Sequence, residues 1–182
     1  MSKTLGGTND RRWRIEHAQV MNDADLSTFG EFNILPSMQP THATSDMYWA
    51  EERLGEERMK YAYAMKTLKN QNGLIALGTD FPVEDISPIK TYYASVARKD
   101  SEGYPDGGFK MTEGLTREET LKGITIWAAI ASFEDENRGS IEVGKFADLV
   151  LLDRDIMTCE EDDILSTEIL QTWNGGELVY EK

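Results

Sequence analysis

Two polar residues stand where predicted strands end, and a third lies between them in the chain. His17 closes an alternating segment, and Asp80 follows the apolar run at residues 74–77. His42 lies in the polar stretch at residues 39–46. In parallel α/β folds, and above all in barrels, chemistry takes place at the C-terminal ends of the strands. These positions therefore predict one shared site.

Each of these residues also has an ordinary structural explanation. A histidine on an inward strand face is more often hydrogen-bonded within the core than bound to a metal. Asp80 must be paired, metal-bound or exposed at the mouth of a site, because burying a bare carboxylate is costly. The structural alternative for Asp80 is that it caps the turn that follows it. For His42, which we expect in a loop, substrate binding and capping of residues 44–46 stay equally open. Arg58 would ordinarily be a solvated charge at the head of a helix.

Other common chemistries lack their residues. No glycine pattern of a dinucleotide-binding turn or a phosphate-binding loop follows a predicted strand. Cys159, the single cysteine, follows no nucleophile pattern, and no serine nucleophile elbow is found. Metal-assisted hydrolysis is therefore the chemistry that the residues support best.

The elements that must position these residues alternate between strands and helices. We predict strands at residues 12–17, 34–38 and 74–77, and helices at 22–32, 56–70, 88–97 and 116–134. Thr116 and Glu119 form a capping box at the start of the last helix, and residues 101–114 are expected to be a loop. This order is typical of an α/β fold with a parallel sheet.

The C-terminal part changes to short strands. We predict a strand at residues 147–153 and a hairpin of residues 170–172 and 178–180 across the Gly175-Gly176 turn. The acidic run at residues 160–163 is expected to be a solvated loop or a helix start rather than a metal site.

Composition narrows the partners and the compartment. The 182 residues are 40% hydrophobic and 29% charged, as in a globular protein of one ordinary domain. The net charge of −14 argues against nucleic acid and anionic membranes as partners. The start of the chain is polar, unlike a secretion signal, and no apolar run approaches the ~20 residues of a membrane-spanning helix. Cys159, as the single cysteine, cannot form an intrachain disulfide. We therefore expect a cytoplasmic protein.

Four motifs then occur in a fixed order along the chain. They are RIEHAQ at residues 14–19, SMQPTHATSD at 37–46, ALGTDFPVE at 76–84 and GSIEVGKFADLVLLDRD at 139–155. By these motifs the chain resembles, over residues 10–180, the C-terminal part of the amidohydrolase 3 branch of the metal-dependent amidohydrolases.

The resemblance implies a fold and an activity. The fold is a partial TIM (β/α)₈ barrel, with strands six to eight in residues 1–138 and strands of a composite β-sandwich in residues 139–182. The activity is metal-dependent hydrolysis of C–N bonds other than peptide bonds in a small amide-like substrate, with a divalent metal, expected to be zinc.

The same resemblance implies roles for individual residues. His17 is a metal ligand that ends strand six, and Asp80 is a metal ligand and general base that ends strand eight. Gln39, His42 and Arg58 fall in motifs that line the substrate pocket. With strand seven between them, the Cα atoms of His17 and Asp80 should lie roughly 10 Å apart at the same end of the sheet.

The chain departs from the family where most of the metal site should be. Members have a His-x-His pair on strand one, a bridging lysine on strand four and a histidine on strand five, but this chain has two histidines in total. A complete barrel also takes ~250 residues. We therefore expect the last part of a longer enzyme, with at most two metal ligands and little activity alone. The alternative is a non-catalytic remnant that serves as a binding or assembly module.

An opened barrel leaves apolar strand faces and two unpaired sheet edges exposed. Both features favour association between chains. We therefore expect a homo-oligomer, or pairing with a missing N-terminal half.

Overall fold

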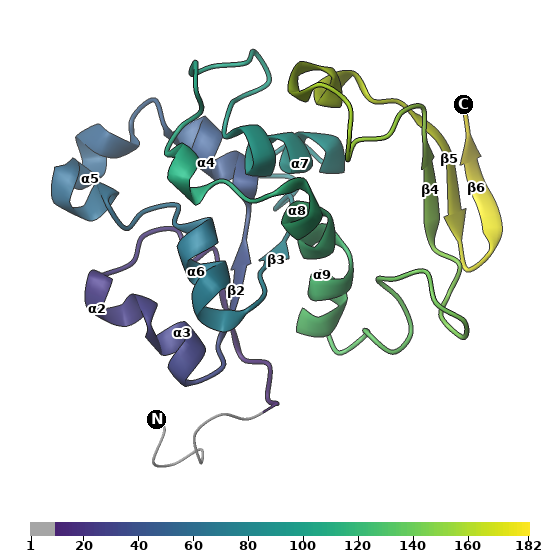
Figure 1. Cartoon of the computed structure of the whole chain (residues 1–182), viewed down its shortest axis with the longest axis horizontal. Helices are drawn as coiled ribbons and strands as arrows, with labels where there is room; N and C mark the ends of the chain where they lie inside the picture. The colour runs from purple at the N-terminus through teal and green to yellow at the C-terminus, as the bar shows by residue number, and fades with distance from the viewer. Residues whose placement is uncertain (1–9) are drawn as a thin grey trace.

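A computed structural model of the chain describes residues 10–182 (Figure 1). The polar start, on which the expectation of a cytoplasmic protein partly rests, lies largely outside the described residues, and so do residues 1–9 of the predicted barrel segment 1–138. Among the described residues, no helix is both long and apolar enough to cross a membrane.

A three-stranded parallel sheet organises the first part of the chain. Its strands are β1 (Arg14–Glu16), β2 (Leu35–Met38) and β3 (Ala76–Leu77), in the order β1-β2-β3. The expectation of an α/β fold with a parallel sheet is therefore confirmed. β1 lies at the sheet edge and Ile15 is 40% exposed, so the face that we expected to be inward is open.

Eight α-helices and two short 3₁₀ helices of the described residues surround or follow this sheet. The α-helices are α2 (Asp23–Leu26), α3 (Thr28–Glu31), α4 (Pro40–Asp46), α5 (Ala50–Met59), α6 (Met65–Asn72), α7 (Pro88–Ala97), α8 (Arg117–Ile124) and α9 (Ile126–Ala131). Short 3₁₀ helices are η1 (Met111–Glu113) and η2 (Glu161–Ser166). The main core lies between the sheet and the helices, where Phe29, Met38 and Leu68 are buried together. The predicted helix at 88–97 is confirmed.

The segment that carries His42 is a helix, not the loop that we expected. Gln39 has extended backbone angles, and Pro40 occupies the first helical position of α4. Proline suits that position because its fixed φ is helical and its missing N–H would be unpaired there in any case. The prediction of a loop was wrong because this proline starts the helix.

The predicted single helix at residues 56–70 is two helices. α5 begins earlier, at Ala50, and ends at Met59, and α6 begins at Met65. Between them Lys110 Nζ donates to the carbonyls of Met59, Lys60 and Ala62. The ammonium binds carbonyls that a continued helix would use, and the chain forms turns there instead. Burial lowers the pKa of Lys110 to about 8.

The predicted helix at 116–134 begins as expected but breaks at one residue. Thr116 and Glu119 form the capping box. At Thr125 the backbone leaves the helical region, and its Oγ1 donates to the Leu121 carbonyl at 2.6 Å. Such a bond offers the backbone an alternative to the regular helical ladder, so α8 and α9 are separate.

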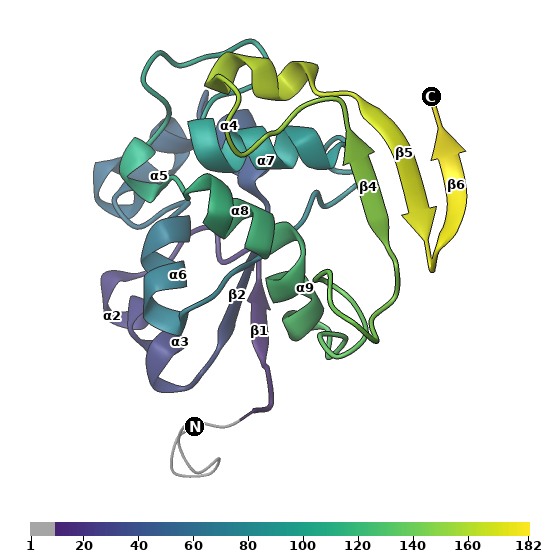
Figure 2. The same ribbon diagram turned by 45° about the vertical axis from the view of Figure 1, so that its right-hand side comes forward.

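A small antiparallel sheet closes the chain. Its strands are β4 (Leu149–Leu152), β5 (Ile169–Asn174) and β6 (Glu177–Glu181), which confirms the predicted hairpin. Helices α7 to α9 lie between this sheet and the parallel one (Figures 1 and 2). Ile156 and Ile164, from the segment between β4 and β5, pack on Tyr92 and Tyr93 of α7. The acidic run enters η2, as the helix-start alternative predicts.

We predict that Gly123→Ala destabilises the protein by about 1 kcal/mol. An added Cβ would lie 2.7 Å from the Leu77 Cγ, so the Leu77 side chain, α8 or β3 must shift. Overpacking costs ~1–3 kcal/mol, whereas alanine in a helix gains ~1 kcal/mol over glycine. Urea unfolding measures the resulting change in the free energy of unfolding, and Glu118→Ala, at an exposed position of the same helix, is the control. A gain in stability at Gly123 would contradict the close helix-to-sheet packing.

Candidate metal centre

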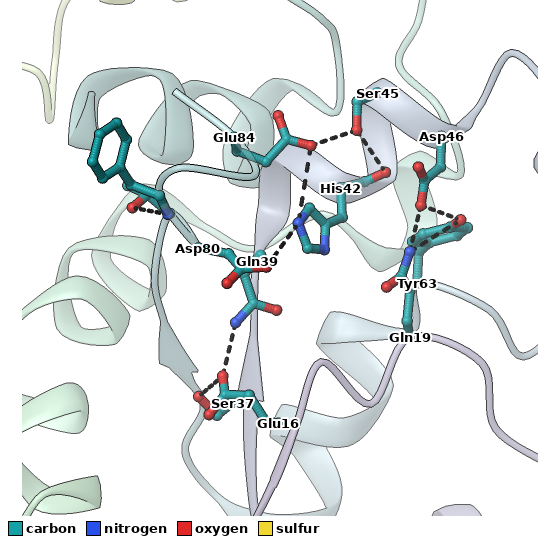
Figure 3. Close-up of polar contacts among 12 residues, drawn as sticks. Glu16, Gln19, Ser37, Gln39, His42, Ser45, Asp46, Tyr63, Asp80 and Glu84 are labelled. Carbon is teal, nitrogen blue, oxygen red and sulfur yellow. Dashed lines mark hydrogen bonds and ion pairs between the residues drawn. The ribbon is translucent and has the colours of Figure 1, made fainter. Parts of the chain in front are cut away.

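Three side chains converge beyond the carboxyl ends of the parallel strands. One imidazole nitrogen each of His17 and His42 and one carboxylate oxygen of Asp80 all lie within 4.8 Å of one another. We call these residues the His–His–Asp group. His42 Nε2 lies 3.5 Å from Asp80 Oδ2 (Figure 3).

The parallel register explains this convergence. His17 directly follows β1, Asp80 comes three residues after β3, and His42 is on α4, which follows β2. Parallel strands end at the same edge of a sheet, so residues after each strand meet there. His17 and Asp80 have positive φ angles of 66° and 58°, so the chain turns sharply at both residues. Both therefore lie at one end of the sheet, as predicted.

The two histidines form a stacked pair. Their ring centroids are 5.4 Å apart and the ring planes differ by 9°. The His42 side chain is 11% exposed, and the Asp80 side chain is 33% exposed. Among the described residues, His42 Nε2 is a buried nitrogen with no hydrogen-bond partner. A buried ring nitrogen without a partner is available to a metal ion, and two nitrogens with one carboxylate oxygen form a donor set that zinc accepts.

This geometry corrects one expectation. The sequence predicted at most two metal ligands, His17 and Asp80, because His42 was expected in a loop with no sequence reason to be the third. Because α4 begins at Pro40, two residues after the end of β2, it places His42 Nε2 within 3.5 Å of Asp80 Oδ2. The described residues therefore offer three donor groups, which is the usual number of protein ligands in a catalytic zinc site.

Gln39 lies beside the group and is held by hydrogen bonds that involve the exposed Glu16. Its Nε2 donates to Glu16 Oε1 at 2.7 Å, and Ser37 Oγ donates to the same oxygen at 2.7 Å. The Gln39 Oε1 is buried and has no hydrogen-bond partner among the described residues. This amide oxygen is thus free to accept a hydrogen bond from another molecule.

Arg58 is not brought to the group. It lies in the last turn of α5 rather than at the head of a helix. Its guanidinium donates to the carbonyls of Leu54 and Arg53 at 2.7 and 3.1 Å. Its predicted role in substrate binding remains a prediction.

Glu84 is a neighbour of the group that residue types and spacing did not reveal. Its Oε1 accepts from Ser45 Oγ at 2.6 Å and lies 3.9 Å from His42 Nε2. The imidazole nitrogen therefore faces two carboxylates, those of Asp80 and Glu84 (Figure 3). The one signal in the sequence was that Glu84 ends the motif ALGTDFPVE.

Comparisons with known proteins agree with this geometry. The model of the amidohydrolase family matches residues 4–180. Protein LONG AFTER FAR-RED 3 of Arabidopsis thaliana is 37% identical over 96% of this chain and 30% of its own length. Putative amidohydrolase YtcJ of Bacillus subtilis is 33% identical over 96% of this chain and 33% of its own length.

Solved structures are similar as well. An uncharacterized metal-dependent hydrolase from Pyrococcus furiosus is 33% identical, with a TM-score of 0.67, over 80% of this chain and 29% of that chain. The chain thus spans about a third of the length of the curated relatives that it matches. With the family model matching nearly every residue, the chain belongs to the amidohydrolase family.

Proposed function

We propose that this chain is the metal-binding C-terminal segment of a hydrolase that cleaves C–N bonds other than peptide bonds. The observation that supports this most is the His–His–Asp group, with its unpartnered His42 Nε2, at the carboxyl edge of a parallel sheet. The similar N-substituted formamide deformylase of Arthrobacter pascens, 32% identical over 70% of this chain, favours a small amide-like substrate.

The three residues would hold a divalent ion, for which we propose zinc. When bound, such an ion lowers the pKa of a water molecule towards neutrality. Asp80 would then accept the proton of the attacking water and return it to the leaving nitrogen, as a general base followed by a general acid. Its partial exposure leaves this carboxylate accessible to water.

Gln39 and His42 have proposed roles in substrate binding. The free Gln39 Oε1 can accept a hydrogen bond from an amide N–H of the substrate. His42 is either the third metal ligand or a substrate contact through Nε2, the nitrogen that faces Asp80, because this nitrogen cannot bind both at once. Metal binding by a His42 variant separates these roles.

We further propose how the segment fits a complete enzyme. Residues 1–138 would contribute strands six to eight of a (β/α)₈ barrel, and residues 139–182 strands of a composite sandwich. The exposed residues of the edge strand β1 support this placement, because an edge strand can pair with a further strand. The rest of such an enzyme would supply further ligands and enclose the substrate.

Metal titration tests the site directly. We predict that zinc binds at one equivalent, and that Asp80→Asn or His42→Asn weakens the affinity at least about 10-fold, because a ligand is lost. Calorimetry measures the affinity, and Asp85→Asn, which alters a nearby exposed acid, is the matched control. Binding at equal strength in all variants would place the zinc elsewhere. If Asp80→Asn weakens zinc binding and His42→Asn does not, His42 is a substrate contact rather than a metal ligand.

An amidase assay tests the dependence on the rest of the enzyme. We predict little or no turnover of N-substituted formamides by the zinc-loaded chain alone, since the proposed remainder of the enzyme, which would supply further ligands, is missing. The same assay is run with Asp80→Asn. Robust turnover that Asp80→Asn abolishes would show that this chain forms a complete site by itself.

A specific observation supports the alternative of an assembly module. Apolar side chains of the small sheet are exposed, namely Leu149, Val150, Leu151, Leu178, Val179 and Tyr180. Exposed apolar patches of this kind favour association. In this alternative the sheet, and not the His–His–Asp group, is the functional part of the chain.

We predict that the chain associates through this sheet. Light scattering should give a mass above that of one chain, and Val179→Glu should lower it, because a charge in an apolar contact is costly to bury. Gln71→Glu adds the same charge at an exposed position of α6 and is the control. A wild-type mass of one chain that persists at high concentration would contradict association.

A further inference from the structure

A second polar cluster lies on the far side of His42 from Asp80. Asp46 Oδ2 accepts a hydrogen bond from Tyr63 Oη at 2.9 Å and a second from Gln19 Nε2. Gln19 Nε2 also lies 3.4 Å from Tyr63 Oη. Figure 3 shows these three side chains meeting at one point, from three separate segments of the chain. We call them the Gln–Asp–Tyr cluster.

The cluster joins the segments that carry the two histidines. Gln19 comes two residues after His17, and Asp46 comes four residues after His42 on α4. Residues four apart on a helix lie on the same side, so Asp46 and His42 share one side of α4. The bond between Gln19 and Asp46 therefore links the turn after β1 to the helix after β2.

The turn at His17 needs such a link. His17 and Ala18 have φ angles of 66° and 42°, which cost roughly 1–2 kcal/mol for each residue with a side chain. Ala18 N donates to the Glu16 carbonyl at 2.9 Å, which holds the start of the turn. Beyond the turn, Tyr63 N donates to the Gln19 carbonyl, Val20 pairs with Ala62, and the side chain of Gln19 adds its bond to Asp46.

Tyr63 is a rigid anchor for the cluster. It is 3% exposed, its N–H donates to the Gln19 carbonyl at 2.7 Å, and its ring contacts Phe109 edge to face. The buried Arg98 Nη2 donates to the Tyr63 carbonyl at 3.4 Å. Burial raises the pKa of Tyr63 to about 12, so its hydroxyl keeps the proton that it donates to Asp46 at neutral pH.

We propose that Asp46 is a positioning residue that fixes the spacing and the stacking of the His17 and His42 rings. It touches neither ring through a hydrogen bond in the described structure. It acts through Gln19 on the turn of His17 and through α4 on His42. Its importance for metal binding rests on the proposed function, but the ring geometry does not.

Nuclear magnetic resonance of the imidazole rings tests this proposal without a metal. The chain has two histidines, so the imidazole region of the spectrum contains only the stacked pair. We expect cross-relaxation between the two rings in the wild type. In Asp46→Ala, which removes the acceptor oxygen of both bonds, and in Tyr63→Phe, this signal should fall by about half or more, with changed ring-current shifts.

Tyr92→Phe is the matched control. It also removes one buried tyrosine hydroxyl, which donates to the Ile156 carbonyl at 3.2 Å and has a pKa that burial likewise raises to about 12. We expect it to lower stability but to leave the imidazole signals unchanged. If Asp46→Ala does not fold, Tyr63→Phe still decides the question. Unchanged imidazole signals in folded Tyr63→Phe, or equal changes in Tyr92→Phe, would overturn the proposal.

Zinc affinity gives the second measurement. We expect Tyr63→Phe to weaken zinc binding about 10-fold, since loss of residues that orient metal ligands typically costs 10–100-fold. Tyr92→Phe should bind zinc as the wild type does. If the wild type binds no zinc, the proposed function fails, and the imidazole spectra still decide whether Asp46 positions the rings. Equal zinc affinity in wild type and Tyr63→Phe would contradict a role of the cluster in metal binding.

Discussion

The parallel pairing of β1, β2 and β3 is the constraint on which the candidate site depends. Glu16 pairs with Ser37, and Met38 pairs with Leu77, so three chain segments leave the sheet at one edge. His17, His42 and Asp80 are each within a few residues of that edge. Without this register, residues separated by up to 63 positions in the chain would have no reason to meet. With antiparallel neighbours, the residues after β2, His42 included, would lie at the opposite end from those after β1 and β3.

The site combines this sheet with unfavourable backbone turns that other contacts hold in place. His17, Ala18 and Asp80 all have positive φ angles, and residues with a side chain adopt them at a cost. Two cations, the buried Arg98 and the half-buried Lys110, donate to carbonyls of the segment that supports the turn after His17. Packing and polar contacts away from the proposed metal ligands therefore determine whether these side chains can face one another.

The sequence predicted the strands, the parallel sheet and the shared end of His17 and Asp80 better than it predicted the helices. Strand positions follow from apolar runs and period-two patterns, which are local signals. The break after Met59 depends on Lys110, about fifty residues later, and no local pattern reveals it. Similarly, His42 joins the group only because Pro40 starts a helix at the edge of the sheet. Contacts between distant residues were the part that composition and spacing did not indicate.

A single metal ion bound between His17, His42 and Asp80 is the core of the proposed function. A crystal structure of the zinc-loaded chain, with anomalous diffraction data collected at the zinc absorption edge, tests it at the atoms concerned. We predict one strong anomalous peak within about 2.0–2.2 Å of an imidazole nitrogen of each histidine and of an Asp80 oxygen. A peak at another position, such as the acidic residues 160–163, with these three side chains unliganded, would contradict the proposed site.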